Sequence, residues 1–397
     1  MSNNRNTDPS QAGSTGSCSG ISYRRIVVKV GTAVLTDTQK GGGLNLPVMA
    51  DLVRQISLLR NRFNAEVIFV TSGAIAAGRQ DLNQAGLHLA ERDIPSRQAL
   101  AAIGQGRLIH AYQQMFEIYG VHVAQALLTI DDLAERQPYL NVRNTLAALL
   151  DMGVVPILNE NDVVAVDEIG EVFGDNDRLS ALVANLVDAD LLVILTDTDG
   201  LYTADPHRNP DATLVPVVER VDERIQSMVG VHRNPWARGG MPTKIEAARL
   251  VTSTGIAMVL CSGRANDAIL RAARAEPVGT LFRPAGEKIE ARKRWMLNRV
   301  KDSEWGEIEV DGGAADALLH RHVSLLPAGV RGVRGDFRRG DIVYIVDEPG
   351  RHIACGITNY DAQDIARIRG FQSDGIVAIL GYHYGQEIVH RNNLVLI

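Results

Sequence analysis

The chain has 397 residues, of which 45% are hydrophobic, and its formal net charge at pH 7 is −6. This length accommodates two or three domains, and the acidic balance gives no overall indication of binding to nucleic acid or to an anionic membrane. No apolar run approaches the roughly 18 residues of a membrane span, so no membrane association is predicted. Cys18, Cys261 and Cys355 match no metal or redox spacing, which fits a reducing cytoplasm.

The N-terminal stretch, residues 1–22, is rich in Ser, Asn, Gly and Thr and lacks the apolar core of a signal peptide. We predict a disordered tail there. In the strand predicted next, residues 26–30, Lys29 interrupts an apolar run, which is costly unless its ammonium meets an anion. A lysine on an edge strand can instead extend its ammonium to water. We favour a phosphate contact, because Gly31 and Thr32 offer backbone donors beside Lys29.

A helix over residues 47–62 and a strand over residues 66–70 come next, and the strand ends in Thr71-Ser72-Gly73-Ala74. Small residues at such a turn let backbone N–H groups approach a ligand closely. Close packing of a helix on the sheet explains the same residues equally well. Apolar spacing then predicts a helix over residues 96–119, a strand over 121–128 and a helix over 144–152.

Two polar clusters stand near the middle of the chain. Residues 159–162, Asn-Glu-Asn-Asp, directly follow a short apolar strand predicted over residues 154–158. Residues 174–177, Gly-Asp-Asn-Asp, precede a helix indicated by the apolar spacing of residues 179–186. One such cluster would suit a loop that caps two elements. In open α/β sheets, however, ligands bind beyond the carboxyl ends of strands, so two clusters favour a site for a small polar substrate and a metal.

An apolar strand over residues 191–195 ends in Thr196 and Asp197, and Tyr202 could stack on a base or simply pack in its loop. Residues 238–244, Arg-Gly-Gly-Met-Pro-Thr-Lys, are typical of a helix N-terminus that receives an anion, although the common P-loop pattern is absent. A strand over residues 256–260 follows. The alternation of strands and helices predicts a mainly parallel sheet covered by helices.

The last part of the chain has a different pattern. Residues 285–300 are polar and are predicted to form a linker between a domain over residues 23–284 and a small β-rich domain over residues 301–397. Strand-like runs lie at residues 306–310, 341–346, 353–356 and 376–380. Acidic side chains outnumber basic ones after residue 298, which argues against a nucleic-acid surface, although a local arginine patch at residues 331–339 remains an option.

In this order, the motifs together resemble the amino-acid kinase family, and within it the branch that phosphorylates glutamate in proline biosynthesis. The stretch Ser-Leu-Leu-Pro-Ala-Gly-Val from residue 324 and Ile-Leu-Gly-Tyr from residue 379 look like the PUA domain, a small barrel appended to many bacterial members. The kinase-like motifs are VVKVGT at residue 27, VTSGAIAAG at 70, LNVRNTLAALLD at 140, NEND at 159, GDNDRLSA at 174, LTDTDGLYTADP at 195 and GGMPTK at 239.

The resemblance implies transfer of the γ-phosphoryl group of ATP to the side-chain carboxylate of L-glutamate, with Mg²⁺ carried by ATP rather than held in a protein cage. The carboxylate is already ionised at pH 7, so no general base is needed. By resemblance, Lys29 and Lys244 would stabilise the transferring group and Asp177 would orient both lysines. Glutamate would be held by Ser72, Asp162 and Asn176. The nucleotide would be bound by Lys29, Thr196, Asp197, Arg238, Gly239, Gly240, Met241, Pro242, Thr243 and Lys244.

The resemblance further implies a cytoplasmic homodimer or homotetramer, feedback inhibition by proline, and a glutamyl phosphate reductase as a possible partner. The chain departs from the family pattern at Arg97, where a lysine is expected, and at Arg238 and Pro242. One alternative is a family kinase that acts on another acid, and the two polar clusters with the appended domain argue against it. A second is an RNA-binding PUA protein with a degenerate kinase fold, which the retention of Lys29, Asp177 and Lys244 disfavours.

Overall fold

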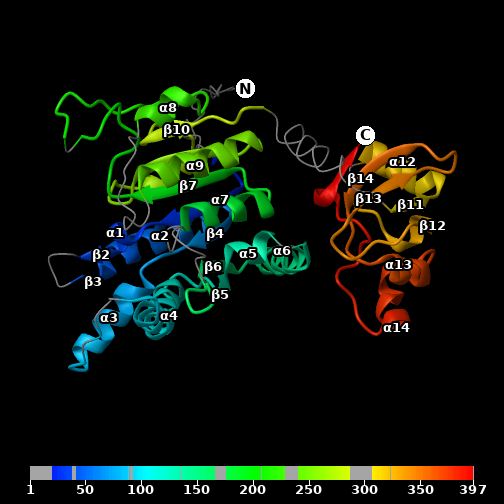
Figure 1. The fold of residues 1–397 in the computed structure, drawn as a ribbon, viewed down its shortest axis with the longest axis horizontal. Helices are drawn as coiled ribbons and strands as arrows, with labels where there is room; N and C mark the ends of the chain where they lie inside the picture. The colour runs from blue at the N-terminus through cyan, green and yellow to red at the C-terminus, as the bar shows by residue number, and fades with distance from the viewer. Residues whose placement is uncertain are drawn as a thin grey trace, which may run out of the picture.

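The computed structural model describes residues 20–37, 42–87, 89, 93–134, 136–165, 176–206, 208–228, 240–286, 306–321 and 323–396. Two folded parts are visible in Figure 1, an N-terminal α/β part and a smaller C-terminal part. Residues 1–19 of the predicted tail and residues 287–300 of the predicted linker lie outside the described residues.

One eight-stranded sheet forms the centre of the N-terminal part, with strand order β5-β6-β4-β1-β7-β9-β10-β8. The pairs from β5 to β9 are parallel, and only β10 runs antiparallel to its neighbour β9. This confirms the predicted mainly parallel sheet. The strands are β1 (Arg25–Val30), β4 (Glu66–Val70), β5 (Val123–Leu128), β6 (Val155–Glu160), β7 (Leu191–Thr196), β8 (Val217–Val218), β9 (Ala257–Ser262) and β10 (Thr280–Phe282).

Helices cover both faces of this sheet, because its central strands are apolar on both sides. In β1, Val28 packs into the core that includes α2 (Leu46–Phe63), α4 (Ile94–Glu117) and α10 (Ala268–Ala273). Its neighbour Val27 points to the opposite face, into the core that includes α6 (Arg136–Asp151), α7 (Asn176–Leu186) and α9 (Met241–Ser253). The remaining elements are α1 (Thr32–Leu35), β2 (Thr36–Asp37), β3 (Gly43–Leu44), α3 (Ala74–Gln84), α5 (Ile130–Ala134) and α8 (Glu223–Met228).

Helix α6 is longer than its sequence pattern indicated, since it begins at Arg136 rather than at residue 144. Pro138 lies in the first turn, where its missing N–H breaks no intrahelical hydrogen bond. Leu140, on the added turns, is fully buried in a small apolar cluster with Cys355 and Val395 of the C-terminal part. Burial against another domain is invisible to helical periodicity, which explains why the early turns were missed.

The C-terminal part contains a five-stranded sheet of order β12-β11-β13-β14-β15 with its own apolar core. The strand predicted at residues 376–380 is wrong, because these residues form helix α14 (Ile376–Leu380), which ends at Gly381 in the left-handed conformation. A five-residue apolar run does not distinguish a strand from a buried helix. The other elements are β11 (Glu307–Val310), α12 (Gly312–Arg321), β12 (Val330–Arg334), β13 (Ile342–Val346), β14 (His352–Ile357), α13 (Ala362–Ile368) and β15 (Leu394–Leu396), with 3-10 turns at Pro327–Gly329, Ser373–Gly375 and Arg391–Asn393.

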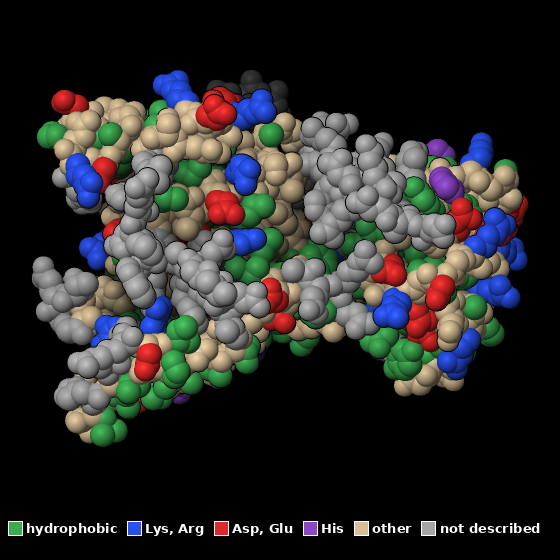
Figure 2. Space-filling model, in the orientation of Figure 1, with side chains coloured by type: hydrophobic (Ala, Val, Ile, Leu, Met, Phe, Trp, Pro, Cys, Tyr) green, Lys and Arg blue, Asp and Glu red, His purple; other side chains and the backbone are tan. Residues whose placement is uncertain are grey.

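Basic and acidic side chains are interspersed over the face of the C-terminal part shown in Figure 2. Arg334, for example, lies 3.5 Å from a carboxylate oxygen of Glu307 and 3.4 Å from one of Glu309. These acidic neighbours offset the charge of the predicted arginine patch at this position.

Candidate active site

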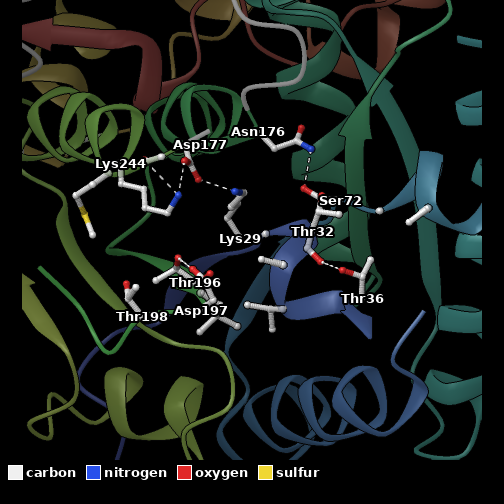
Figure 3. Close-up of a pocket in the computed structure, with 18 of the residues that line it drawn as sticks. Lys29, Thr32, Thr36, Ser72, Asn176, Asp177, Thr196, Asp197, Thr198 and Lys244 are labelled. Carbon is white, nitrogen blue, oxygen red and sulfur yellow. Dashed lines mark hydrogen bonds and ion pairs between the residues drawn. The ribbon is translucent and has the colours of Figure 1, made fainter. Parts of the chain in front are cut away.

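The carboxyl ends of β1, β4, β6 and β7 open onto one cavity of about 920 Å³. This volume lies at the upper end of the range for small-molecule sites, roughly 300–1,000 Å³. Figure 3 shows that side chains from β1, the turn after β4, α7, β7 and α9 converge on it. The cavity therefore lies at the edge of the sheet where ligands of open α/β folds bind.

Lys29, Asp177 and Lys244 meet at the centre of this cavity (Figure 3). Lys29 Nζ lies 2.6 Å from Asp177 Oδ1, and Lys244 Nζ lies 3.1 Å from Asp177 Oδ2. One carboxylate thus holds two ammonium groups that come from β1 and from the first turn of α9. Two lysines and one aspartate leave a net charge of +1, which suits an anionic ligand.

The pKa of Asp177 reflects two opposing effects. Burial raises it, but the charges of Lys29 and Lys244 and hydrogen bonds from Lys29 and Thr243 outweigh burial and lower the pKa to about 2. Asp177 is therefore ionised at neutral pH even though only 1% of its surface is exposed. The ionised carboxylate keeps both ammonium groups in place before any ligand arrives.

The first turn of α9 adds a third contact to Asp177. The Thr243 hydroxyl oxygen lies 2.8 Å from Asp177 Oδ2, close enough to donate to it, and accepts a hydrogen bond from the Gly240 backbone N–H at 3.3 Å. Pro242 lies in the same turn, as its sequence position predicts, and its side chain is exposed. Gly240 and Met241 line the cavity, whereas Thr243 acts on the carboxylate beneath it.

A buried amide network connects the turn after β4 to the start of α7. Asn176 Nδ2 donates to Thr71 O, Ser72 Oγ and Asn159 Oδ1, each at 3.0 Å. Because Ser72 accepts in this bond, its own hydroxyl hydrogen can be donated to a ligand. Asn176 Oδ1 is buried and has no hydrogen-bond partner within the described residues, so it can accept from a ligand N–H group.

Asp162 lines the same cavity from the turn that follows β6. Burial raises the pKa of its carboxyl to about 6, and the nearby charge of Arg97 partly opposes this rise. A cationic group of a ligand would lower this pKa again, because it would stabilise the ionised carboxylate. Asp162 is therefore placed to bind a ligand cation.

The predicted nucleotide residues divide into three groups. Thr196 and Asp197, at the end of β7, line the cavity, and the Thr196 hydroxyl donates to Asp197 Oδ1 at 3.0 Å. Pro242 and Thr243 are described but do not line it, and Arg238 and Gly239 lie outside the described residues. Gly174 and Asp175 of the second polar cluster also lie outside them.

Several cavity residues were not assigned a role from the sequence. Asn159 had a signal, since it opens the first polar cluster, and its side chain joins the amide network. Arg79 had none, because a single arginine in an alanine-rich helix resembles any exposed helical residue. Arg97 was noted only as a departure from a family pattern. All three line the cavity.

Metal and membrane features are limited in the described part of the chain. No group of three or more His, Cys, Asp or Glu side chains there could hold a metal ion, and no described helix is long and apolar enough to cross a membrane. Both oxygens of Asp177 are already engaged by lysines, so this carboxylate is a poor metal ligand. The donor set fits Mg²⁺ that is bound mainly through the phosphates of a nucleotide.

Comparison with known proteins identifies the family. Residues 24–262 match the model of the amino acid kinase family, and residues 306–380 match that of the PUA domain. The chain is 48% identical over 376 residues to a glutamate 5-kinase of Dehalococcoides mccartyi strain CBDB1, covering 94% of this chain and 99% of that protein. It is 50% identical over 374 residues to a glutamate 5-kinase of Herpetosiphon aurantiacus, covering 94% and 98%. The chain therefore belongs to the amino acid kinase family and carries a PUA domain after its kinase domain.

Proposed function

We propose that this kinase transfers the γ-phosphoryl group of ATP to the side-chain carboxylate of L-glutamate. The product is L-glutamyl 5-phosphate, which enters proline biosynthesis. The observation that carries this proposal is the position of Lys29, Asp177 and Lys244 at the centre of one cavity. The relatives named glutamate 5-kinase, which align with nearly the whole chain, support glutamate as the substrate.

In the reaction, an oxygen of the glutamate side chain attacks the γ-phosphorus while the bond between this phosphorus and the β–γ bridging oxygen breaks. The electron pair of that bond leaves with ADP. Negative charge spreads over the γ-phosphoryl oxygens in the transition state, so catalysis depends on positioning and on charge stabilisation. Lys29 and Lys244 would supply this stabilisation, and Asp177 would keep their ammonium groups aligned.

We assign the two substrates to different sides of the cavity. Ser72, Asn176 and Asp162 would bind glutamate on the side of β4 and β6, with the Ser72 hydroxyl as a donor. Thr196, Asp197, Gly240 and Met241 would bind the nucleotide on the side of β7 and α9. Mg²⁺, arriving on ATP, would neutralise phosphate charge. Arg238 and Gly239 remain proposed nucleotide contacts from the sequence alone.

A hydroxylamine trap tests the proposal directly. The purified protein is incubated with ATP, Mg²⁺, hydroxylamine and one acid, and acyl hydroxamate is measured by its iron colour. We expect colour with L-glutamate but not with L-aspartate or N-acetyl-L-glutamate. Lys244→Ala should abolish the colour, whereas Arg249→Ala, an exposed position on the same helix α9, should retain it. Colour with another acid alone would refute glutamate as the substrate.

Further parts of the proposal rest on the sequence resemblance. We propose a homodimer or homotetramer in the cytoplasm, a kinase domain over residues 23–284 and a PUA domain over residues 301–397. Proline is proposed to inhibit at or near the glutamate site. If added proline leaves the kinetics with glutamate unchanged, this proposal is wrong. A glutamyl phosphate reductase is the proposed consumer of the product. RNA binding by the PUA domain has only the family match in its favour.

A further inference from the structure

The N-terminal half of α4 is held against β6 and the turn that follows it. Gln98 Nε2 donates to the Val163 backbone oxygen at 3.3 Å, and Asn159 Nδ2 donates to Gln105 Oε1 at 2.9 Å. These two hydrogen bonds connect α4 to residues on both sides of Asp162. The helix start is also fixed, because Asp93 Oδ1 accepts from the Ser96 backbone N–H at 2.9 Å. The side chains of the first turn of α4 are therefore held on the side of the helix start that faces the turn with Asp162.

Arg97 lies within the first turn of α4 and lines the cavity together with Asp162. The positive charge of its guanidinium favours the ionised form of the Asp162 carboxyl and lowers the pKa of that group. Both side chains are half-buried, so their charges are less screened than those of exposed residues. The cavity is thus lined by one cation from α4 and one anion from the turn after β6, and the hydrogen bond between Gln98 and Val163 joins these two segments.

L-Glutamate carries three charges at pH 7, two carboxylates and one ammonium. If the side-chain carboxylate faces Lys29 for phosphoryl transfer, the α-ammonium and α-carboxylate need partners of opposite charge elsewhere. Ser72 and Asn176 are neutral and can supply only hydrogen bonds. The neighbouring anion and cation at Asp162 and Arg97 match the two charges on the α-carbon of an amino acid.

Building on the proposed function, we propose that Arg97 binds the α-carboxylate of L-glutamate while Asp162 binds its α-ammonium, so that Arg97 determines specificity for a free α-carboxylate. A planar guanidinium can bind both oxygens of a carboxylate at once. A lysine at this position would keep the charge but lose the paired geometry. Arg97 would contribute to binding rather than to the chemical step, because the α-carboxylate lies away from the transferring phosphoryl group.

Two glutamate analogues separate the two charges. L-Isoglutamine has a neutral α-carboxamide in place of the α-carboxylate, and L-2-hydroxyglutarate has a hydroxyl in place of the ammonium. Both keep the side-chain carboxylate. KM for L-glutamate and inhibition constants for both analogues would be measured with the wild-type enzyme and with Arg97→Gln, Arg97→Lys, Asp162→Asn and Arg79→Gln. Arg79 is the matched control, since it lines the same cavity from α3.

Arg97→Gln should raise KM for glutamate at least roughly tenfold, as loss of one charged hydrogen-bonded contact does, with kcat little changed. The same variant should weaken the binding of 2-hydroxyglutarate by an equal factor but leave the binding of isoglutamine unchanged. Arg97→Lys should restore part of the loss. Asp162→Asn should weaken the binding of glutamate and of isoglutamine but not that of 2-hydroxyglutarate.

Three results would overturn the inference. Arg97→Gln could lose equal affinity for glutamate and for isoglutamine, or its KM for glutamate could be unchanged. Alternatively, Arg79→Gln rather than Arg97→Gln could lose the preference for glutamate over isoglutamine. Failure of the proposed function would look different, because the wild-type enzyme would then form no γ-glutamyl hydroxamate.

Discussion

Replacing Asp177 by Asn removes the one anion between two buried ammonium groups. Lys29 and Lys244 then face each other without compensation, and breaking a buried ion pair by removing one partner typically costs about 3–5 kcal/mol. The variant should therefore have a lower free energy of unfolding at pH 7. Its kcat should also fall by roughly 10²-fold, the scale for losing one preorganised electrostatic contact.

Part of this cost depends on pH. Lowering the pKa of Asp177 from 3.8 to about 2 corresponds to about 2 kcal/mol of stability. A carboxyl whose pKa is depressed in the folded state contributes this stability above the unfolded-state pKa and loses it as pH falls through the folded-state pKa. The contribution is complete above about pH 5, is roughly halved at pH 3 and is nearly gone at pH 2.

Urea unfolding of the wild type and Asp177→Asn at pH 7, 5, 4 and 3 would measure this difference in free energy. We expect it to be constant from pH 7 to 5 and to shrink by about 1 kcal/mol at pH 3. Asp151→Asn, an exposed carboxylate at the end of α6, should change stability by less than about 0.5 kcal/mol at every pH. A difference for Asp177→Asn that does not change with pH would contradict the assigned ion pairs.

Three further substitutions, one of them a control, test packing around the site and between the domains. A Cβ at Gly104 would lie 1.8 Å from the Ala74 backbone oxygen, so α3 and the turn before it would have to shift in Gly104→Ala. The substitution should therefore lower the free energy of unfolding by about 1–3 kcal/mol and raise KM for glutamate. A Cβ at Gly106 would meet no heavy atom within 4 Å, so the control Gly106→Ala should leave stability unchanged or raise it by up to about 1 kcal/mol. Urea unfolding and glutamate kinetics would be measured for both variants. Leu140→Ala should lower the free energy of unfolding by about 2–3 kcal/mol and separate the thermal unfolding of the two domains into two calorimetric transitions. A single transition with an unchanged midpoint would contradict the contact of Leu140 with Cys355.

The sequence predicted much of the kinase domain because its strands are strongly apolar and its helices are strongly periodic. Ser72 closely follows β4 and Thr196 ends β7, so their place at the carboxyl edge of the sheet could be inferred from the order of elements, whereas Lys244 was predicted as part of a helix N-terminus. The distances between these side chains could not be inferred from that order. Lys29 meets Asp177 because α7 packs against β1, and this packing depends on the fold of the whole domain.

Residues on helix sides were the hardest to predict. Arg79 and Arg97 come from helices whose pattern gives no sign that one side chain points into a cavity, and the close approach of Gly78 to the Leu100 backbone oxygen is visible only in three dimensions. The C-terminal part shows the same limit, since the apolar run of α14 matched a strand until its packing against α13 was known.

The position of β1 also governs the order in which the domain can be assembled. Its residue Ile26 pairs with Val67 of β4 and with Leu191 of β7. At about 5–20 residues per second, a ribosome needs on the order of ten seconds to reach β7 after completing β1. During that interval one edge of β1, four of whose six residues are apolar, stays uncovered, and pairings this distant in sequence form slowly. Placing Lys29 on the central strand therefore means that its surroundings are complete only after β7 has been synthesised.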